Sequence, residues 1–458
     1  MRQRAMLAAL ALCMLLSALG TSIANVGLPA VAQAFGASVG QVQWIVLAYL
    51  LAVTTLIVGI GRLGDLAGRR RLLLAGIALF TMASFLCGLA PALPWLVAAR
   101  ALQGLGAAAM MGLAMSFAAG AAAQGGTGGV MGLLGTMSAV GTALGPALGG
   151  LLIGAGGWRT LFLASVPLGI AAWLLAYRGL PPDPARAGGE RGGFDAAGTL
   201  LLALTLGAYA LAMSAGGGSV GALNLALLLA AGVGAWLFVQ AAARAVSPLI
   251  PLALLRNRLL AARLGTTALV STVMMATLVV GPFYLARTLS LTPAAVGLAL
   301  AAGPLAAALS GVPAGRLADR AGTRRVTIAG LALMLAASMA LALLPASGGV
   351  TGYVAPLVVL TIGYALFQAA NNSALMDAAP ANERGVVSSM LNLARNLGLV
   401  TGASLMGAVF AFGAQALTAL PEAVAAGLRR TFVFACALLA AALLIAWRAE
   451  RAHQQQQT

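Results

Sequence analysis

The chain of 458 residues is 61% hydrophobic and only 8% charged, whereas about 25% of the residues in a soluble globular chain are charged. Its net charge of +17 arises from 26 basic residues, all of them arginine, which are scattered through short breaks between apolar runs. Scattered arginines argue against a nucleic-acid partner, because such proteins gather their basic residues on one surface. The absence of lysine from the sequence also excludes a P-loop ATPase, whose lysine binds the phosphates.

Apolar runs recur along the whole chain, and each can cross a hydrocarbon core of about 30 Å as a helix of about 20 residues. The runs predict an all-α polytopic membrane protein with fourteen spans, which we expect to be a monomer in the lipid bilayer. We expect the spans at 6–33, 43–61, 72–90, 94–119, 127–153, 158–178, 196–215, 220–241, 261–289, 293–314, 326–345, 353–376, 385–413 and 430–448.

The arginines predict the orientation of the spans, because cytoplasmic loops collect them. Most lie in the two tails and in the breaks that follow even-numbered spans, so we expect a multi-pass protein of the cell membrane with both termini in the cytoplasm. The predicted parts are a six-helix half at 1–178, a cytoplasmic linker at 179–195, two inserted helices at 196–245, a second six-helix half at 246–448 and a cytoplasmic tail at 449–458.

A short segment, GRLGDLAGRRR at 61–71, returns as GRLADRAGTRR at 315–325. Each copy joins the second and third spans of its half, so the chain reads as two equivalent six-helix halves with two helices inserted between them. Repeated halves of this kind are a transporter architecture. The candidate cytoplasmic gate residues in the two copies are Gly61, Asp65, Gly68, Arg70, Arg71, Gly315, Asp319, Gly322, Arg324 and Arg325.

Several segments along the chain resemble the major facilitator superfamily, and in particular its fourteen-span drug–proton antiporter branch. The repeated segment is similar to the family's signature between spans 2 and 3, and RALQGLGAAAM at 100–110 is similar to the motif that carries a membrane arginine. IANVGLP at 23–29, together with VQWIVLAYLL at 42–51, resembles spans 1 and 2 of that branch. The sequence at 132–150 is similar to the antiporter motif through Gly132, Gly141, Gly145, Pro146, Gly149 and Gly150.

The resemblance implies that the repeated segments hold the two halves together when the cytoplasmic side is closed. We expect Asp65 to face the start of span 13, at 384–388, and Asp319 to face the start of span 5, at 125–129. A carboxylate in such a place can bind guanidinium groups or the positive end of a helix, gaining about 0.3–2 kcal/mol. The alternative is a plain positive-inside loop in which the aspartates have no role.

Gly141, Gly145 and Gly149 recur every four residues, so they share one face of a helix and allow a neighbouring helix to approach closely. Pro146 removes a backbone hydrogen bond and bends the span. Beyond tight packing, we expect a functional bend and seal here, as the resemblance to the antiporter motif implies. Gly398 and Gly402 repeat the spacing in span 13 without the proline.

Arg100 lies about two turns inside span 4, where a charge is costly unless it finds partners. We expect a functional cation that faces the cavity and has Gln103 as its neighbour. The alternative is a structural arginine that reaches the membrane surface with its guanidinium.

The drug exporters that this chain resembles carry an aspartate in span 1, where this sequence has Gly20. We find no acid at mid-membrane elsewhere in the sequence, so the charge inside the protein is set by Arg100, with Arg395 in span 13 as a second candidate. The missing acid predicts neutral or anionic substrates. It also leaves proton coupling open between Asp65, Asp377, a proton carried by the substrate, and no coupling at all.

Polar and methionine side chains within the spans are candidates for the substrate cavity, because adaptable Met and a few amides suit varied apolar ligands. The alternative for each methionine is plain core packing. The candidates are Asn25, Tyr49, Met110, Met274, Met275, Gln368 and Asn371.

These features predict a secondary transporter that exports small amphipathic organic compounds, such as drugs, by alternating access and proton antiport. The alternative is a metabolite transporter or uptake carrier of the same superfamily with a different coupling mechanism. We expect no enzyme activity, no cofactor and no metal, because Cys13, Cys87 and Cys436 lie in apolar spans and the only histidine is His453 in the tail.

Overall fold

The computed structural model describes residues 2–57, 59–122, 127–183, 195–214, 221–244, 257–345, 348–378, 384–413 and 421–455. Throughout these ranges the regular secondary structure is helical and contains no strand. Fourteen helical segments are long and apolar enough to cross a membrane. The prediction of an all-α polytopic protein with fourteen spans is therefore confirmed.

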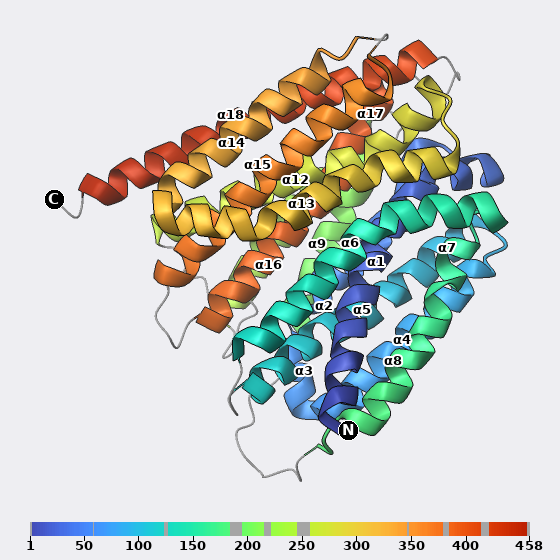
Figure 1. Ribbon diagram of the computed structural model, residues 1–458, viewed down its shortest axis with the longest axis vertical. Helices are drawn as coiled ribbons and strands as arrows, with labels where there is room; N and C mark the ends of the chain where they lie inside the picture. The colour runs from blue at the N-terminus through green and yellow to red at the C-terminus, as the bar shows by residue number, and fades with distance from the viewer. Residues whose placement is uncertain are drawn as a thin grey trace. The chain divides into compact units, whose positions relative to one another are not determined.

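Figure 1 shows the helices, coloured from the N-terminus to the C-terminus. The first part of the chain forms α1 (Arg2–Phe35), α2 (Val39–Ile57), α3 (Ile60–Ala67), α4 (Arg69–Gly88), α5 (Leu93–Ala122), α6 (Thr127–Gly156), α7 (Thr160–Leu163) and α8 (Ser165–Gly179). The rest forms α9 (Ala196–Ser214), α10 (Ala222–Arg244), α12 (Arg258–Phe283), α13 (Pro293–Ala321), α14 (Thr323–Ala342), α15 (Gly349–Ala378), α16 (Arg384–Thr401), α17 (Gly407–Gly413) and α18 (Pro421–Gln455). Two π-helical turns, η1 (Tyr284–Thr288) and η3 (Gly402–Met406), follow α12 and α16.

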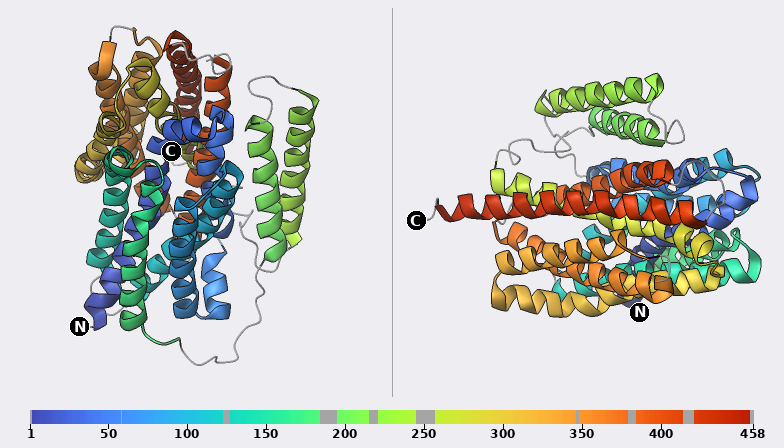
Figure 2. Two further views of the ribbon diagram at one scale, coloured as in Figure 1. Left: turned by 90° about the vertical axis from the view of Figure 1, so that its right-hand side faces the viewer. Right: turned by 90° about the horizontal axis from the view of Figure 1, so that it is seen from above.

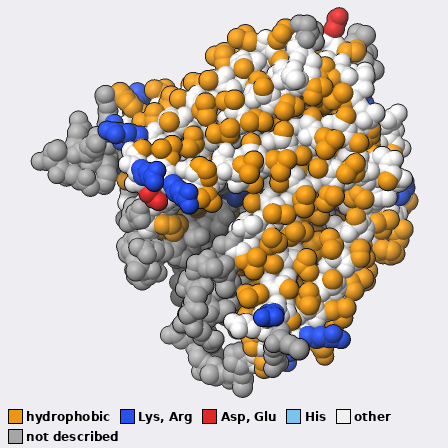
Figure 3. Space-filling view, in the orientation of Figure 1, with side chains coloured by type: hydrophobic (Ala, Val, Ile, Leu, Met, Phe, Trp, Pro, Cys, Tyr) orange, Lys and Arg blue, Asp and Glu red, His pale blue; other side chains and the backbone are white. Residues whose placement is uncertain are grey.

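The surface of the spans is apolar, as contact with lipid requires. Leu200 is 60% exposed and Leu309 is 79% exposed, although both lie within spans. Figure 3 shows hydrophobic side chains covering the visible face, with the arginines gathered at its margins. This distribution matches a protein whose helices face hydrocarbon along their length and water at their ends.

The helices form two compact units. The first comprises Met1–Ala37, Trp44–Leu211 and Leu225–Leu249, and the second comprises Ser38–Gln43, Ala212–Asn224 and Ile250–Thr458. Within the first unit, α1 packs against α5, α6 and α8, and α4 packs against α5 and α8.

The second unit repeats most of these helix pairings. There α12 packs against α15, α16 and α18, while α14 packs against α15 and α18. Because α12, α14, α15, α16 and α18 follow one another as α1, α4, α5, α6 and α8 do, the two six-helix halves are pseudo-symmetric. The inserted helices α9 and α10 form an antiparallel pair (Figure 2), in which Asn224 Nδ2 donates to the carbonyl of Ala212 at 2.7 Å.

The repeated segments are helical, which corrects the expectation of a loop between spans. Residues 61–67 belong to α3, and residues 315–321 form the end of α13. Only one residue of each copy leaves the helix, Gly68 with φ of 96° and Gly322 with φ of 86°. Residues other than glycine rarely adopt such positive φ values, so each copy is a sharp helix–glycine–helix junction.

Candidate functional site

Arg100 is fully buried in the first unit, two turns after the start of α5. Its Nε donates to the carbonyl of Ile45 in α2 at 2.8 Å, and its Nη2 donates to the carbonyl of Gly20 in α1 at 3.0 Å. Its Nη1 donates to Oε1 of Gln103, one turn along α5. The guanidinium therefore joins three helices, and it is not exposed at the protein surface.

Two aromatic rings flank this guanidinium. Its Cζ lies 4.2 Å from the centroid of the Tyr49 ring and 5.8 Å from that of Phe162, within the range of a cation–π interaction. The Tyr49 hydroxyl donates to the carbonyl of Ser17 at 2.8 Å. The ring is therefore held against α1 while its face covers Arg100.

Gln103 extends the network to α4. Its Nε2 donates to the hydroxyl of Ser84 at 2.7 Å, and that hydroxyl donates to the carbonyl of Phe80 at 2.7 Å. The amide is thereby fixed with its oxygen toward Arg100 and its nitrogen toward α4. The sequence indicated the proximity of Gln103 to Arg100, but it gave no signal for Ser84 or for the backbone acceptors.

None of the acidic side chains that the structure describes lies against Arg100. Asp183 and Asp195 lie between helices, Asp319 is exposed near the end of α13, and Glu422 is exposed in the first turn of α18. An arginine side chain stays protonated in proteins. Within the described residues, its charge is therefore balanced by neutral oxygens and ring faces alone.

The energetic terms are of comparable size. An arginine at the centre of a membrane helix costs about 2.5–3.5 kcal/mol on insertion scales, and each hydrogen bond to a charged group contributes about 1.5–3 kcal/mol. Three such bonds are enough to offset the cost. The consequence is a positive charge that is held in the first unit without a carboxylate beside it.

Gly20 holds the position at which the resemblance expects an acid, and its carbonyl contacts the Arg100 guanidinium. A Cβ atom added there would lie 3.1 Å from the Tyr49 hydroxyl and 3.4 Å from the Phe80 ring. The close approach of α1 lets the Gly20 carbonyl accept from Arg100. The residue that replaces the acid thus supplies one of the neutral acceptors.

The glycine face of α6 packs directly on α1. A Cβ at Gly141 would collide with the carbonyl of Leu15, and one at Gly145 would collide with the hydroxyl of Ser22. That hydroxyl also donates to the carbonyl of Gly141 at 3.3 Å. The α6 helix continues through Pro146 without interruption, so the glycines bring the two helices together over several turns.

The second unit repeats this contact with different local geometry. The hydroxyl of Thr272 in α12 donates to the carbonyl of Gly398 in α16 at 3.1 Å. A Cβ at Gly398 would collide with the carbonyl of Ala268, and one at Gly402 would lie 2.5 Å from that of Thr272. Where α6 has its proline, this helix instead contains the π-helical turn η3. Such turns are frequent at functional sites.

Asp183 lies after α8 and binds the start of α4, a role that the sequence did not indicate. Its Oδ1 accepts from the backbone N–H of Arg70 at 2.8 Å, and its Oδ2 accepts from that of Arg71 at 3.2 Å. It therefore satisfies the first amides of α4, as an N-terminal cap does. A Cβ at Gly68 would lie 2.5 Å from Oδ2 of Asp183, so this glycine admits the carboxylate.

The other gate candidates are distributed as follows. The backbone of Asp65 lies in α3, but its side chain falls outside the described residues. Residues 125–126, part of the segment that Asp319 is expected to face, also lie outside them. Arg71 and Arg325 are exposed, and Arg324 is partly buried. A Cβ at either Gly61 or Gly315 would meet no atom within 4 Å.

The cavity candidates are mostly buried among helices of their own unit. Met110 and Met275 are fully buried, whereas Met274 and Gln368 are partly buried. Complete burial of the first two methionines is the pattern of core packing, the alternative stated above.

The two buried asparagines each have one hydrogen-bonded group. Asn25 Nδ2 donates to the carbonyl of Thr21 at 2.9 Å, and Asn371 Nδ2 donates to the hydroxyl of Thr267 at 2.9 Å. Both asparagines are 1% exposed.

Among the described residues, no three His, Cys, Asp or Glu side chains gather as metal ligands would.

A family model described as "Major Facilitator Superfamily" matches residues 10–403. The chain belongs to the major facilitator superfamily. Members of the superfamily are transporters, so this chain is a multi-pass membrane protein that acts as a secondary transporter of small molecules.

Curated relatives differ in what their names say they carry. The chain is 34% identical over 428 residues to the uncharacterized transporter YebQ of Escherichia coli (strain K12), covering 91% of this chain and 93% of that protein. It is 30% identical to the riboflavin transporter RibZ of Clostridioides difficile (strain 630), covering 88% and 86%. It is also 30% identical to the multidrug resistance protein Stp of Mycobacterium tuberculosis (strain ATCC 25618 / H37Rv), covering 85% and 72%.

A solved structure has the same fold. The D-xylose–proton symporter aligns with a TM-score of 0.71 at 14% identity, covering 97% of each chain. At this identity the likeness concerns the fold alone.

Proposed function

We propose that this protein exports small amphipathic organic compounds across the cell membrane by alternating access, and that it prefers neutral or anionic compounds. The observation that carries the proposal is Arg100, which is buried among neutral oxygens and aromatic rings. A transporter that selects lipophilic cations needs a negative charge to balance them. Among the described residues around Arg100, the buried charge is positive instead.

Coulomb's law gives the size of the preference. A monovalent cation about 10 Å from the guanidinium is repelled by about 1.7 kcal/mol at an effective dielectric constant of 20. An anion at the same place gains the same amount. The two charges therefore differ by about 3 kcal/mol, or roughly a hundredfold in affinity.

Export is supported by the glycine face of α6. Its resemblance to the antiporter motif, together with its direct packing on α1, favours the antiporter branch over uptake carriers. The relative Stp is named as a multidrug resistance protein, which favours the same direction. For the coupling ion we propose protons, carried by Asp65, by Asp377 or by the substrate itself.

The repeated segments are proposed as the cytoplasmic gate, with both termini on that side of the membrane. Each copy is a helix end followed by a single glycine junction. Such a junction sets the direction of the helix that follows it. Asp65 and Asp319 lie on the helix that precedes each junction, where a carboxylate can bind the opposite half in one state and release it in the other.

A second candidate function is transport of a flavin-like metabolite. The relative RibZ is named as a riboflavin transporter and is matched over most of both chains. Riboflavin is a neutral aromatic compound with a polar side chain, so it meets the same charge requirement as the proposed drugs.

An accumulation assay separates these functions. Cells with and without the protein receive three probes of similar size, namely a neutral or anionic dye, riboflavin and a quaternary ammonium dye, before and after collapse of the proton gradient. The proposal expects lower accumulation of the neutral or anionic dye, abolished when the gradient collapses. Increased riboflavin accumulation would favour the second candidate, and strong export of the quaternary ammonium dye would overturn the charge argument.

A further inference from the structure

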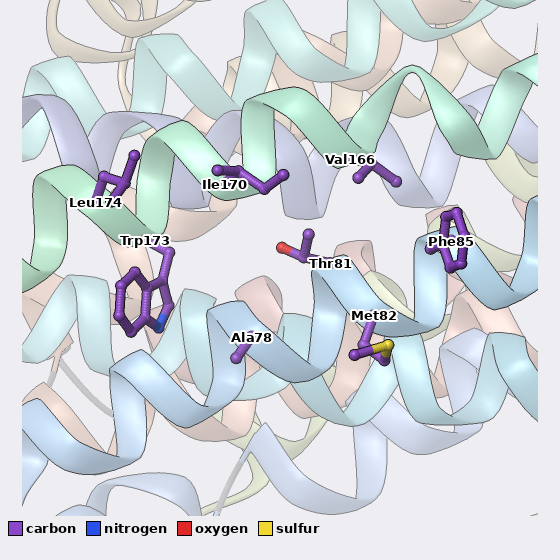
Figure 4. A pocket seen from close by; sticks show the side chains of 8 residues that line it. All are labelled: Ala78, Thr81, Met82, Phe85, Val166, Ile170, Trp173 and Leu174. Carbon is purple, nitrogen blue, oxygen red and sulfur yellow. The ribbon is translucent and has the colours of Figure 1, made fainter.

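An apolar groove of about 550 Å³ lies between α4 and α8 in the first unit. Figure 4 shows the side chains of Met82 and Phe85 from α4 and of Ile170 and Leu174 from α8 along its walls. The hydroxyl of Thr81, the polar exception, donates to its own helix at the carbonyl of Ile77. The groove therefore offers a hydrocarbon surface without a polar group to fix a polar ligand.

The groove is open to the side, within the part of the protein that faces lipid. Both helices are membrane spans, at Arg69–Gly88 and Thr160–Gly179. Met82 is 60% exposed and Ile170 is 51% exposed. An occupant can therefore enter from the hydrocarbon core without crossing the protein.

One end of the groove has the composition of a membrane interface. Trp173 lines the groove and stacks on Tyr177, with ring centroids 5.3 Å apart and an interplanar angle of 10°. The Cζ of Arg70 lies 5.5 Å from the Tyr177 ring, and its Nη2 donates to the Tyr177 carbonyl at 2.8 Å. Tryptophan and tyrosine gather where headgroups meet hydrocarbon, so the aromatic pair marks that boundary.

Basic residues extend beyond the aromatic pair. Arg71 and Arg178 are exposed there, next to Arg70. Among the described residues, Asp183 is an acid at this end, and its two oxygens accept from the backbone amides of α4. Along α4, Arg71 precedes Ala78 at the groove by about 10 Å of helix, which is within the length of a phospholipid.

We propose that this groove binds an acyl chain of an anionic phospholipid whose phosphate lies at Arg71 and Arg178. The apolar walls take the chain, Trp173 and Tyr177 contact the glycerol region, and the guanidinium groups bind the phosphate. The proposal concerns the lipid-facing side of the first unit, so it stands independently of the transported substrate.

The test uses the full protein in vesicles with photoreactive lipids. Phosphatidylglycerol and phosphatidylcholine carrying the same diazirine acyl chain are compared, and labelled peptides are mapped by mass spectrometry. Phosphatidylglycerol should label the peptides of α4 and α8 roughly fivefold more for each contributing arginine, from about 1 kcal/mol per basic residue near an anionic surface. Arg71→Gln should lower this ratio about fivefold while leaving labelling by phosphatidylcholine unchanged.

Two phenylalanine variants separate the groove from the general lipid surface. Ala78 is exposed, so Ala78→Phe fills the groove without disturbing the core and should reduce labelling by both lipids. Leu309→Phe on α13, at a side chain that is 79% exposed, should leave the labelling of α4 and α8 unchanged. Equal labelling of α4, α8 and α13 by both lipids would overturn the proposal. Labelling of α4 and α8 that Ala78→Phe leaves unchanged would overturn it as well.

Discussion

The glycine junctions allow a matched pair of substitutions, Gly68→Ala and Gly322→Ala. Both residues have φ near 90°, so alanine introduces backbone strain of about 1–3 kcal/mol at either position. A Cβ at Gly68 would also lie 2.5 Å from Oδ2 of Asp183, whereas one at Gly322 meets nothing within 4 Å. Displacing the carboxylate removes the cap of α4, at a cost of about 0.5–2 kcal/mol. Gly68→Ala should therefore be more destabilising than Gly322→Ala by that amount.

The measurement is the free energy of unfolding in mixed micelles, obtained by titration with denaturing detergent. Asp183→Ala provides the internal control, because it removes the cap without touching either glycine. In that background the two glycine variants should cost about the same. If Gly68→Ala keeps its additional cost when Asp183 is absent, the contact does not account for the requirement for glycine.

Three further substitutions test the helix contacts and the buried cation. Gly141→Ala should destabilise the first unit by about 1–3 kcal/mol in the same unfolding assay, because it forces α1 away from α6. Its control is Gly154→Ala, which has open space around it and should be neutral or slightly stabilising. Thr272→Val removes one hydrogen bond to α16 and should cost about 1 kcal/mol by detergent denaturation; no measurable cost would show that this bond is dispensable. Arg100→Lys keeps the charge but cannot bind three acceptors in three directions, so export should fall at least tenfold, while Arg159→Lys at an exposed position should retain it. Full export by the Arg100→Lys variant would contradict the role given to the guanidinium geometry.

The fold was accessible from the sequence because membrane helices obey simple rules. Length and hydropathy predict the spans, and the copy of 61–71 at 315–325 predicts the repeated halves. The charges in these copies predict a loop, because they interrupt the apolar runs. Residues 61–67 are helical instead, because at the end of a span charged side chains can extend into water without interrupting the helix.

The site was predictable only in part. Arg100 and Gln103 stand one helical turn apart, so their contact follows from the sequence. The carbonyls of Gly20 and Ile45 could not be foreseen, because backbone acceptors leave no mark in the residue type and depend on how α1, α2 and α5 pack. Asp183 was missed for a related reason, since its partners are amides of a helix more than one hundred residues earlier.

The charge preference set by Arg100 is the central claim, and transport by the purified protein tests it most directly. Proteoliposomes are loaded with a matched series of dyes that share one aromatic body and differ only in carrying a negative, neutral or quaternary ammonium group. The account predicts transport of the negative and neutral dyes, with the quaternary ammonium dye slower by at least tenfold. Transport of the quaternary ammonium dye at the rate of the neutral one, or faster, would contradict it.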